Sequence, residues 1–172
     1  GEPADMKLDV AGALPGEQFF SRFDPRRYLG DAISDLKRPQ FFAIVSSSAL
    51  AMTLARKSAG KVDGFVVEGS SAGGHNAPPR GPLTLDANGE PVYGLRDSPD
   101  LEQIRALGLP FWLGGSYGDS VKLEKAEALG AKGIQVGTAF AFCEESGMAP
   151  ALKASVLAAS RDGRVKVFTD PY

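Results

Sequence analysis

The sequence predicts an α/β protein of the (β/α)8 barrel type, on three observations. Short apolar runs bounded by glycine alternate with amphipathic segments, as in parallel βαβ units. These runs begin at residues 41, 64, 110 and 133, so they are 23, 46 and 23 residues apart. The alternation never reverses along the chain, which favours a barrel over a doubly wound sheet. Four such units account for about half of an eight-unit barrel.

Composition limits the classes of function. The chain has 172 residues, of which 43% are hydrophobic and 23% charged, as expected for a globular domain. Its net charge of −2 argues against a nucleic-acid partner. One cysteine and one histidine give no disulfide framework and no zinc site, so we expect a reducing, cytoplasmic environment and no metal. No apolar run approaches the roughly 20 residues of a membrane span.

The first elements follow from local patterns. Residues 1–40 are weakly patterned and are expected to be an irregular lead-in to the barrel part, residues 41–172. The first strand is expected at 41–45. A helix from residue 49 to about 57 follows, with Ser48 as its N-cap.

The second strand is expected at 64–67, and the gap before the third, at 110–113, is twice as long as the others. This gap contains a predicted β-hairpin at about 82–95, centred on Asn88-Gly89. The hairpin is interpreted either as a flap over the mouth of the site or as an insertion with no part in it.

The later helices carry clear end signals. One is expected to have Ser98 as N-cap and Pro99 in its first turn, and others are expected at about 120–129 and 150–160. The fourth strand, 133–136, lies between those two. Because the chain lacks an initial methionine and stops just after a strand-like segment, we expect both ends to be cut from a longer protein.

Glycines at the strand ends indicate a phosphate site. Gly114-Gly115 and Gly137-Thr138 follow the last two strands, and backbone N–H groups in such loops bind phosphate. His75 follows Gly73-Gly74 after the second strand, where a neutral imidazole can accept a proton. Glu68, at the end of that strand, could orient His75, contact a cofactor ring or be a solvated carboxylate.

Three segments resemble a known family. They are Val-Glu-Gly-Ser-Ser-Ala-Gly-Gly-His at 67–75, Leu-Gly-Gly-Ser at 113–116 and Gly-Ile-Gln-Val-Gly-Thr-Ala-Phe at 133–140. Together they resemble the C-terminal signatures of nitronate monooxygenases, formerly called 2-nitropropane dioxygenases, which are FMN-dependent (β/α)8 barrels. The resemblance covers about residues 41–147. Since the family's N-terminal signature is absent, the chain looks like the C-terminal half of such a barrel.

The resemblance also implies a site and a reaction. His75 would remove the α-proton of a nitroalkane or position the nitronate, and O2 would complete the oxidation to a carbonyl compound and nitrite. The FMN site would comprise these residues: Glu68, Gly73, Gly74, Gly114, Gly115, Gln135, Gly137 and Thr138.

Two alternatives remain open at this stage. Related flavin barrels are NAD(P)H-dependent reductases of quinones or enoyl thioesters, and a half-barrel could also be non-catalytic. The expected partners are a small nitronate or nitroalkane and O2. A second copy of the chain, or the missing N-terminal half, would cover the open sheet edges.

Overall fold

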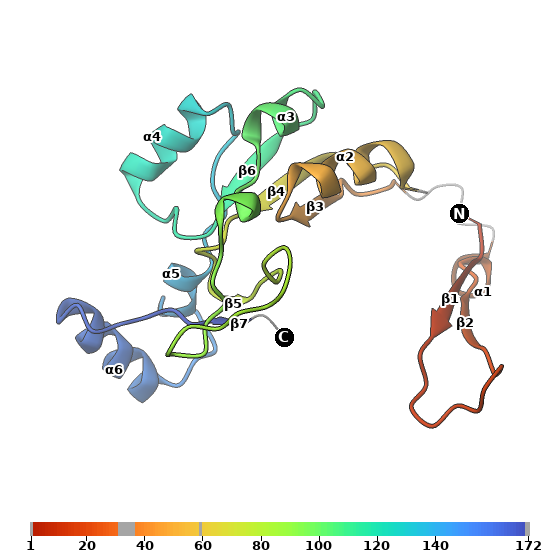
Figure 1. The fold of residues 1–172 in the computed structure, drawn as a ribbon, viewed down its shortest axis with the longest axis horizontal. Coiled ribbons are helices and arrows are strands. Elements are labelled where there is room, and N and C mark those ends of the chain that lie inside the picture. The colour runs from red at the N-terminus through yellow and green to blue at the C-terminus, as the bar shows by residue number, and fades with distance from the viewer. Residues whose placement is uncertain (1, 31–36, 59, 171–172) are drawn as a thin grey trace. The chain divides into compact units, whose positions relative to one another are not determined.

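The computed structural model describes residues 2–30, 37–58 and 60–170. They belong to two compact units, Gly1–Pro39 and Gln40–Tyr172. The first unit consists of an antiparallel strand pair and a single-turn helix: β1 (Ala4–Leu8), β2 (Phe19–Phe23) and α1 (Arg26–Leu29) (Figure 1). The expected irregular lead-in therefore contains regular pairing. The sequence did not predict this strand pair, because the two strands are joined by a long loop and not by a two-residue hairpin turn. Gly12 and Gly16 form separate turns in that loop.

The second unit is built on a parallel sheet in the order β3-β4-β6. Its strands are β3 (Phe42–Val45), β4 (Gly64–Glu68) and β6 (Phe111–Gly114). The expected fourth strand is reduced to one parallel bridge between Leu113 and Ile134, next to which the N–H of Gln135 donates to the carbonyl of Leu113 at 2.9 Å. The described residues thus form part of a parallel sheet and do not close a barrel.

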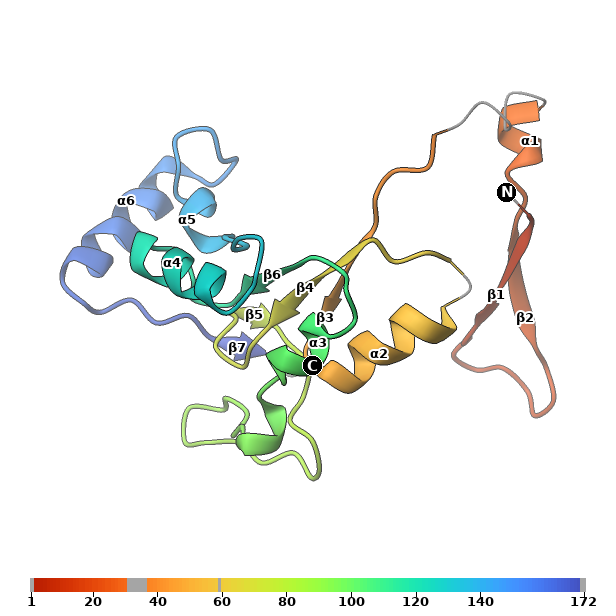
Figure 2. The same cartoon turned by 90° about the horizontal axis from the view of Figure 1, so that it is seen from above.

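Helices connect and follow the strands, as Figure 2 shows. They are α2 (Ser48–Lys57), α3 (Leu101–Arg105), α4 (Ser120–Ala128), α5 (Thr138–Ala141) and α6 (Pro150–Arg161). Pro150 occupies the first turn of α6, where its missing N–H costs no hydrogen bond. Among the described residues, no helix combines the length and the apolar character that a membrane crossing requires.

Two helix starts differ from the sequence-based expectation. Ser47 caps α2 in place of Ser48, because its Oγ accepts a backbone N–H of the first turn at 3.2 Å. The N-cap of α3 is Asp100, whose Oδ1 accepts a backbone N–H at 3.1 Å, so Ser98 and Pro99 lie before the helix. Each shift is small. Cap propensity alone does not distinguish neighbouring residues that can all serve as caps.

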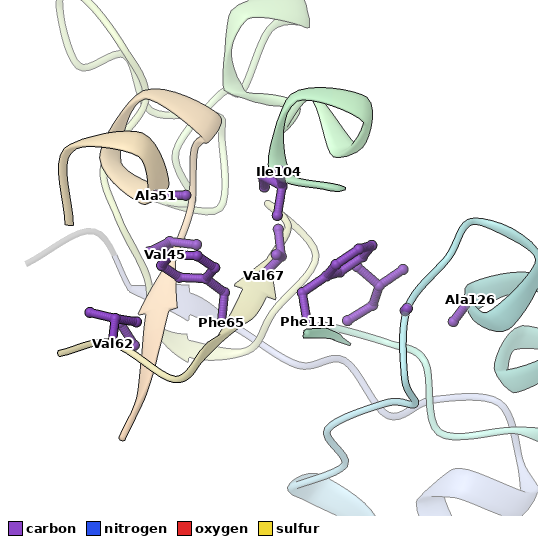
Figure 3. Close-up of a cluster of buried hydrophobic side chains, with 11 residues drawn as sticks. Val45, Ala51, Val62, Phe65, Val67, Ile104, Phe111 and Ala126 are labelled. Atoms are coloured by element: carbon purple, nitrogen blue, oxygen red, sulfur yellow. The ribbon is translucent and has the colours of Figure 1, made fainter. Parts of the chain in front are cut away.

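The core lies between the sheet and the helices on one face (Figure 3). Phe65 and Val67 of β4 pack beside Phe111 of β6, and Ile104 of α3 packs onto them. Phe65 and Ile104 are both 0% exposed. These side chains alternate along their strands, as a sheet with one helix-covered face requires.

The opposite face of the sheet carries aromatic side chains. The rings of Phe42 and Trp112 meet edge to face with centroids 4.9 Å apart. Gly64 makes room for this contact, since a Cβ there would lie 2.6 Å from the ring of Phe42. Ile44, on the same face, is 56% exposed. In a closed barrel this face would point into the interior.

A second, smaller sheet holds the segment around the histidine. It pairs β5 (Gly74–His75) in parallel with β7 (Thr169–Asp170), so the last strand lies just beyond the strand-like residues 165–168. The predicted hairpin is present, with a bridge between Leu85 and Pro91. It reaches this sheet through Glu90, whose Oε1 accepts the N–H of Thr169 at 3.1 Å.

Candidate functional site

The ends of β4 and β6 meet at one edge of the sheet. Glu68 and Gly114 are register partners at the carboxyl ends of these parallel strands. The loops that follow are joined by two hydrogen bonds. The Oγ of Ser71 donates to the carbonyl of Gly115 at 3.3 Å, and the Oγ of Ser116 donates to the carbonyl of Ser71 at 3.1 Å. Ligands bind at this edge in parallel α/β proteins.

A cavity of about 240 Å³, here called the strand-end cavity, opens between these loops and the segment leading into α5. Its lining combines glycines, hydroxyl groups and two longer polar side chains. The lining residues are Glu68, Ala72, Gly73, Gly115, Ser116, Tyr117, Gly118, Gln135, Val136, Gly137, Thr138 and Ala139. Six of the residues expected at a cofactor site therefore share one cavity: Glu68, Gly73, Gly115, Gln135, Gly137 and Thr138.

The lining offers hydrogen-bond donors without protein acceptors. Among the described residues, the backbone N–H groups of Gly115, Ser116, Gly137 and Thr138 have no acceptor. Gly115 and Ser116 have positive φ angles of 90° and 59°, and a Cβ at Gly137 would meet nothing within 4 Å. Neighbouring backbone N–H groups that have no protein acceptor and line one cavity suit a phosphate or a similar anion. A phosphate-bearing cofactor fits this set of donors.

Two polar side chains flank the end of β6 on the face away from the core. A Cβ placed on Gly114 would lie 3.2 Å from Cγ of Glu68 and 3.1 Å from Oε1 of Gln135. Gly114 itself does not line the cavity. Its missing side chain lets Glu68 and Gln135 approach the cavity from two neighbouring segments.

His75 lies beside the strand-end cavity and does not line it. The imidazole is exposed, and Asp170 is its register partner across β5 and β7. Gly74 does not line the cavity either, whereas Gly73 does. A Cβ on Gly73 would overlap the side chain of Val167, so the last part of the chain packs directly against this glycine.

Asn76 stabilises the histidine loop, and the sequence analysis did not single it out. It is 4% exposed, its Nδ2 donates to the carbonyl of Gly69 at 3.2 Å, and its Oδ1 accepts the N–H of Ala77 at 2.8 Å. Ser116 joins the two loops and was not among the predicted site residues, although it lies in the Leu-Gly-Gly-Ser segment. Its place after Gly114-Gly115 was the available signal. For Asn76 the deciding property is burial, which sequence spacing does not reveal.

The fold and the site define a class: α/β proteins with a parallel sheet and a cavity at its glycine-rich strand ends. Comparison with known proteins makes the class specific. The family described as nitronate monooxygenase matches residues 20–169. The chain belongs to the nitronate monooxygenase family of flavin-dependent oxidoreductases, which confirms the resemblance seen in its motifs.

Two curated relatives are similar to this chain and carry different names. The chain is 34% identical over 130 residues to a probable nitronate monooxygenase of Bacillus subtilis (strain 168), covering 76% of this chain and 35% of the relative. It is 31% identical over 124 residues to a (3aS,4S,5R,7aS)-5-hydroxy-7a-methyl-1-oxo-octahydro-1H-indene-4-carboxyl-CoA dehydrogenase of Mycobacterium tuberculosis (strain ATCC 25618 / H37Rv), covering 72% of this chain and 32% of the relative. The chain thus spans about a third of the length of these relatives.

A solved structure supports the fold. The FabK (M276A) mutant from Thermotoga maritima superposes with a TM-score of 0.50 at 22% sequence identity, covering 78% of this chain and 39% of that one. The family and this neighbour together give the chain a TIM-barrel-type fold, of which the described residues form a part.

Proposed function

We propose that the strand-end cavity binds the phosphate of FMN and that the protein oxidises alkyl nitronates or nitroalkanes with O2. The observation that carries this proposal is the set of backbone N–H groups without acceptors at Gly115, Ser116, Gly137 and Thr138. These groups would hold the phosphate. Glu68 and Gln135, on either side of Gly114, would contact the rest of the cofactor. Bound FMN would supply the two-electron redox chemistry.

In this proposal His75 is the base. A neutral imidazole nitrogen accepts the α-proton of a nitroalkane, which converts the substrate to its nitronate. The pairing of β5 with β7 and the hydrogen bonds of Asn76 fix the backbone on both sides of the histidine. The products are a carbonyl compound and nitrite.

The cofactor test compares two flavins that differ only in the phosphate. Titration of the purified protein, followed by quenching of flavin fluorescence, should show tighter binding of FMN than of riboflavin. Charge-assisted hydrogen bonds to the phosphate favour at least about a tenfold difference. Equal affinity for both flavins would show that the cavity does not recognise phosphate.

The base test uses His75→Asn with two forms of one substrate. Turnover of the neutral nitroalkane should fall about 10²-fold or more, the usual contribution of a positioned base. Turnover of the preformed nitronate, which has already lost the proton, should fall much less. Undiminished turnover of the neutral nitroalkane would remove His75 from this role.

The name of the mycobacterial relative favours a second candidate. That protein is a CoA-thioester dehydrogenase by name, so we consider an NAD(P)H-dependent flavin reductase of a thioester or a quinone. Anaerobic mixing of the FMN-loaded protein separates the two. Bleaching of the flavin by a nitronate and not by NADPH supports the first candidate, and the reverse supports the second.

The face of the sheet opposite the core indicates that the protein needs a further binding partner or further strands. Ile44 and the ring pair of Phe42 and Trp112 lie where the interior of a closed barrel would be. We propose that further barrel strands or a second copy of the chain covers this face. Light scattering of the purified protein measures the second possibility, and a monomer at all concentrations would exclude it.

A further inference from the structure

Two more cavities share lining residues with each other, and one of them shares Glu68 with the strand-end cavity. The connecting cavity, of about 30 Å³, is lined among others by Glu68, Asn76, Arg80, Tyr93 and Asp97. The arginine cavity, of about 270 Å³, lies beyond it. Its principal residues are Arg80, Tyr93, Leu95, Arg96 and Asp97. Figure 2 shows this yellow-green part of the chain looping away from the sheet between β5 and α3.

The three cavities share walls. Glu68 lines both the strand-end and the connecting cavity, and Arg80, Tyr93 and Asp97 line both the connecting and the arginine cavity. The wall is fixed at Tyr93, whose O–H donates to the carbonyl of Ala77 at 2.9 Å. Burial, and then the charge of Asp97, raise the pKa of Tyr93, so it stays a hydrogen-bond donor at neutral pH. An elongated molecule could therefore contact all three cavities.

Asp97 fixes the backbone that carries the two arginines. Its Oδ2 accepts the N–H of Gly94 and its Oδ1 accepts the N–H of Arg80, both at 2.7 Å. These two hydrogen bonds lower the pKa of Asp97 below its usual value of 3.8, so the group is a carboxylate at neutral pH. The bonds hold residue 80 against the 3-10 helix η2 (Leu95–Asp97), and both arginines keep their places at the cavity.

The side chains of Arg80 and Arg96 are exposed, and the carboxylate of Asp97 is the charged group that acts on both. Among the described residues, no carboxylate lies within 4.0 Å of the side chain of Arg80 or Arg96, and neither side chain makes a hydrogen bond. Asp97 offsets one of their two positive charges and uses its oxygens on backbone N–H groups. The cavity wall therefore has a net charge of +1 and two unoccupied sets of guanidinium donors. Such forks match the oxygens of phosphate groups.

We propose that the arginine cavity binds the diphosphate group of a nucleotide-derived substrate or co-substrate whose reacting end would meet the flavin at the edge of the strand-end cavity. The inference rests on the proposed function only in placing the reaction at the strand-end cavity. A diphosphate carries enough oxygens to engage both guanidinium groups at once. The same group occurs in coenzyme A thioesters and in nicotinamide dinucleotides, and the experiment distinguishes these sources.

The test measures binding of inorganic pyrophosphate by calorimetry, with FMN at saturation to occupy the strand-end cavity. The double variant Arg80→Gln, Arg96→Gln should bind pyrophosphate at least about tenfold more weakly than the wild type, the loss expected for charge-assisted hydrogen bonds. Arg56→Gln is the matched control. It removes one positive charge from the last turn of α2, outside the linings of the three cavities, and should leave binding unchanged.

Three results would overturn the inference. They are no pyrophosphate binding by the wild type, equal binding by the double variant, or an equal loss in Arg56→Gln, which would indicate a general charge effect. If FMN displaces pyrophosphate and the double variant binds it normally, the anion occupies the strand-end cavity. The proposed FMN site then stands and the arginine site does not. If FMN does not bind but the double variant still loses pyrophosphate, the proposed function fails and the arginine site stands.

Competition identifies the source of the diphosphate. Displacement of pyrophosphate by coenzyme A and not by NADPH assigns the site to a thioester substrate, and the opposite result assigns it to a nicotinamide co-substrate. Failure of both to compete would refute the nucleotide-derived class of ligand.

Discussion

Gly115 lies where two loops of the strand-end cavity meet, so close to the second loop that a side chain would force its neighbour to shift. A Cβ on this residue would lie 3.0 Å from the backbone nitrogen of Ala72 and 3.3 Å from its Cα. Ala72 cannot move aside easily, because it is 6% exposed and its carbonyl accepts the buried hydroxyl of Thr169 at 3.1 Å. Gly115 also has a φ angle of 90°, which L side chains rarely adopt.

We therefore expect Gly115→Ala to lower the free energy of unfolding by about 2–4 kcal/mol. Backbone strain of this kind costs about 1–3 kcal/mol, and forcing a methyl group into a packed contact adds about 1–3 kcal/mol. The lower part of the combined range applies, since the contact is too short by only a few tenths of an ångström. FMN should also bind more weakly, because the N–H groups of this loop would shift.

Urea denaturation followed by the fluorescence of Trp112 measures the effect near its origin. Trp112 is the one tryptophan of the chain and precedes the loop on β6. Gly137→Ala is the control, because its φ of −109° suits alanine and a Cβ would meet nothing within 4 Å. Its free energy of unfolding should stay within about 1 kcal/mol of the wild type. A Gly115→Ala protein within about 0.5 kcal/mol of the wild type would refute the reasoning.

Three further predictions concern the core, a helix cap and acid sensitivity. In thermal unfolding, Ile104→Ala should cost about 2–5 kcal/mol, because this side chain is 0% exposed, whereas Leu95→Ala, 96% exposed, should change stability little. By circular dichroism in urea, Ser47→Ala should cost about 1 kcal/mol and Ser48→Ala much less, and the reverse order would contradict the observed cap. The lowered pKa of Asp97 means that its contribution to stability is present above pH 3.8 and is lost as pH falls through its folded-state pKa. Its carboxyl resonance should therefore titrate with a midpoint below 3.8, and a midpoint at or above 3.8 would refute this assignment.

Local sequence pattern determined most elements of the second unit. The apolar runs at β3, β4 and β6 and the amphipathic helices between them were predictable because burial on a sheet leaves a readable pattern. The hairpin around Asn88-Gly89 was predictable from its turn residues, and Gly89 indeed has a φ of 83°. The position of the strand-end cavity could also be anticipated, since parallel strands bring all their carboxyl ends to one edge.

Contacts between segments far apart in the sequence could not be predicted and are known only from the tertiary structure. His75 pairs with Asp170, which lies far from it in the sequence, and no local sequence pattern predicts this pairing. The same holds for the fourth strand. Its residues look like a strand, but the segment pairs only through Ile134 because its other neighbour is not among the described strands.

The sequence by itself thus determined which residues can form strands, turns and glycine-rich loops, since these depend on hydrophobic period and on backbone freedom at glycine. Only the tertiary structure decided which loops share a cavity, that His75 lies beside that cavity, and that Arg80 and Arg96 come together at another. The physical reason is that those relations depend on the packing of segments far apart in the chain. Composition and spacing do not encode that packing locally.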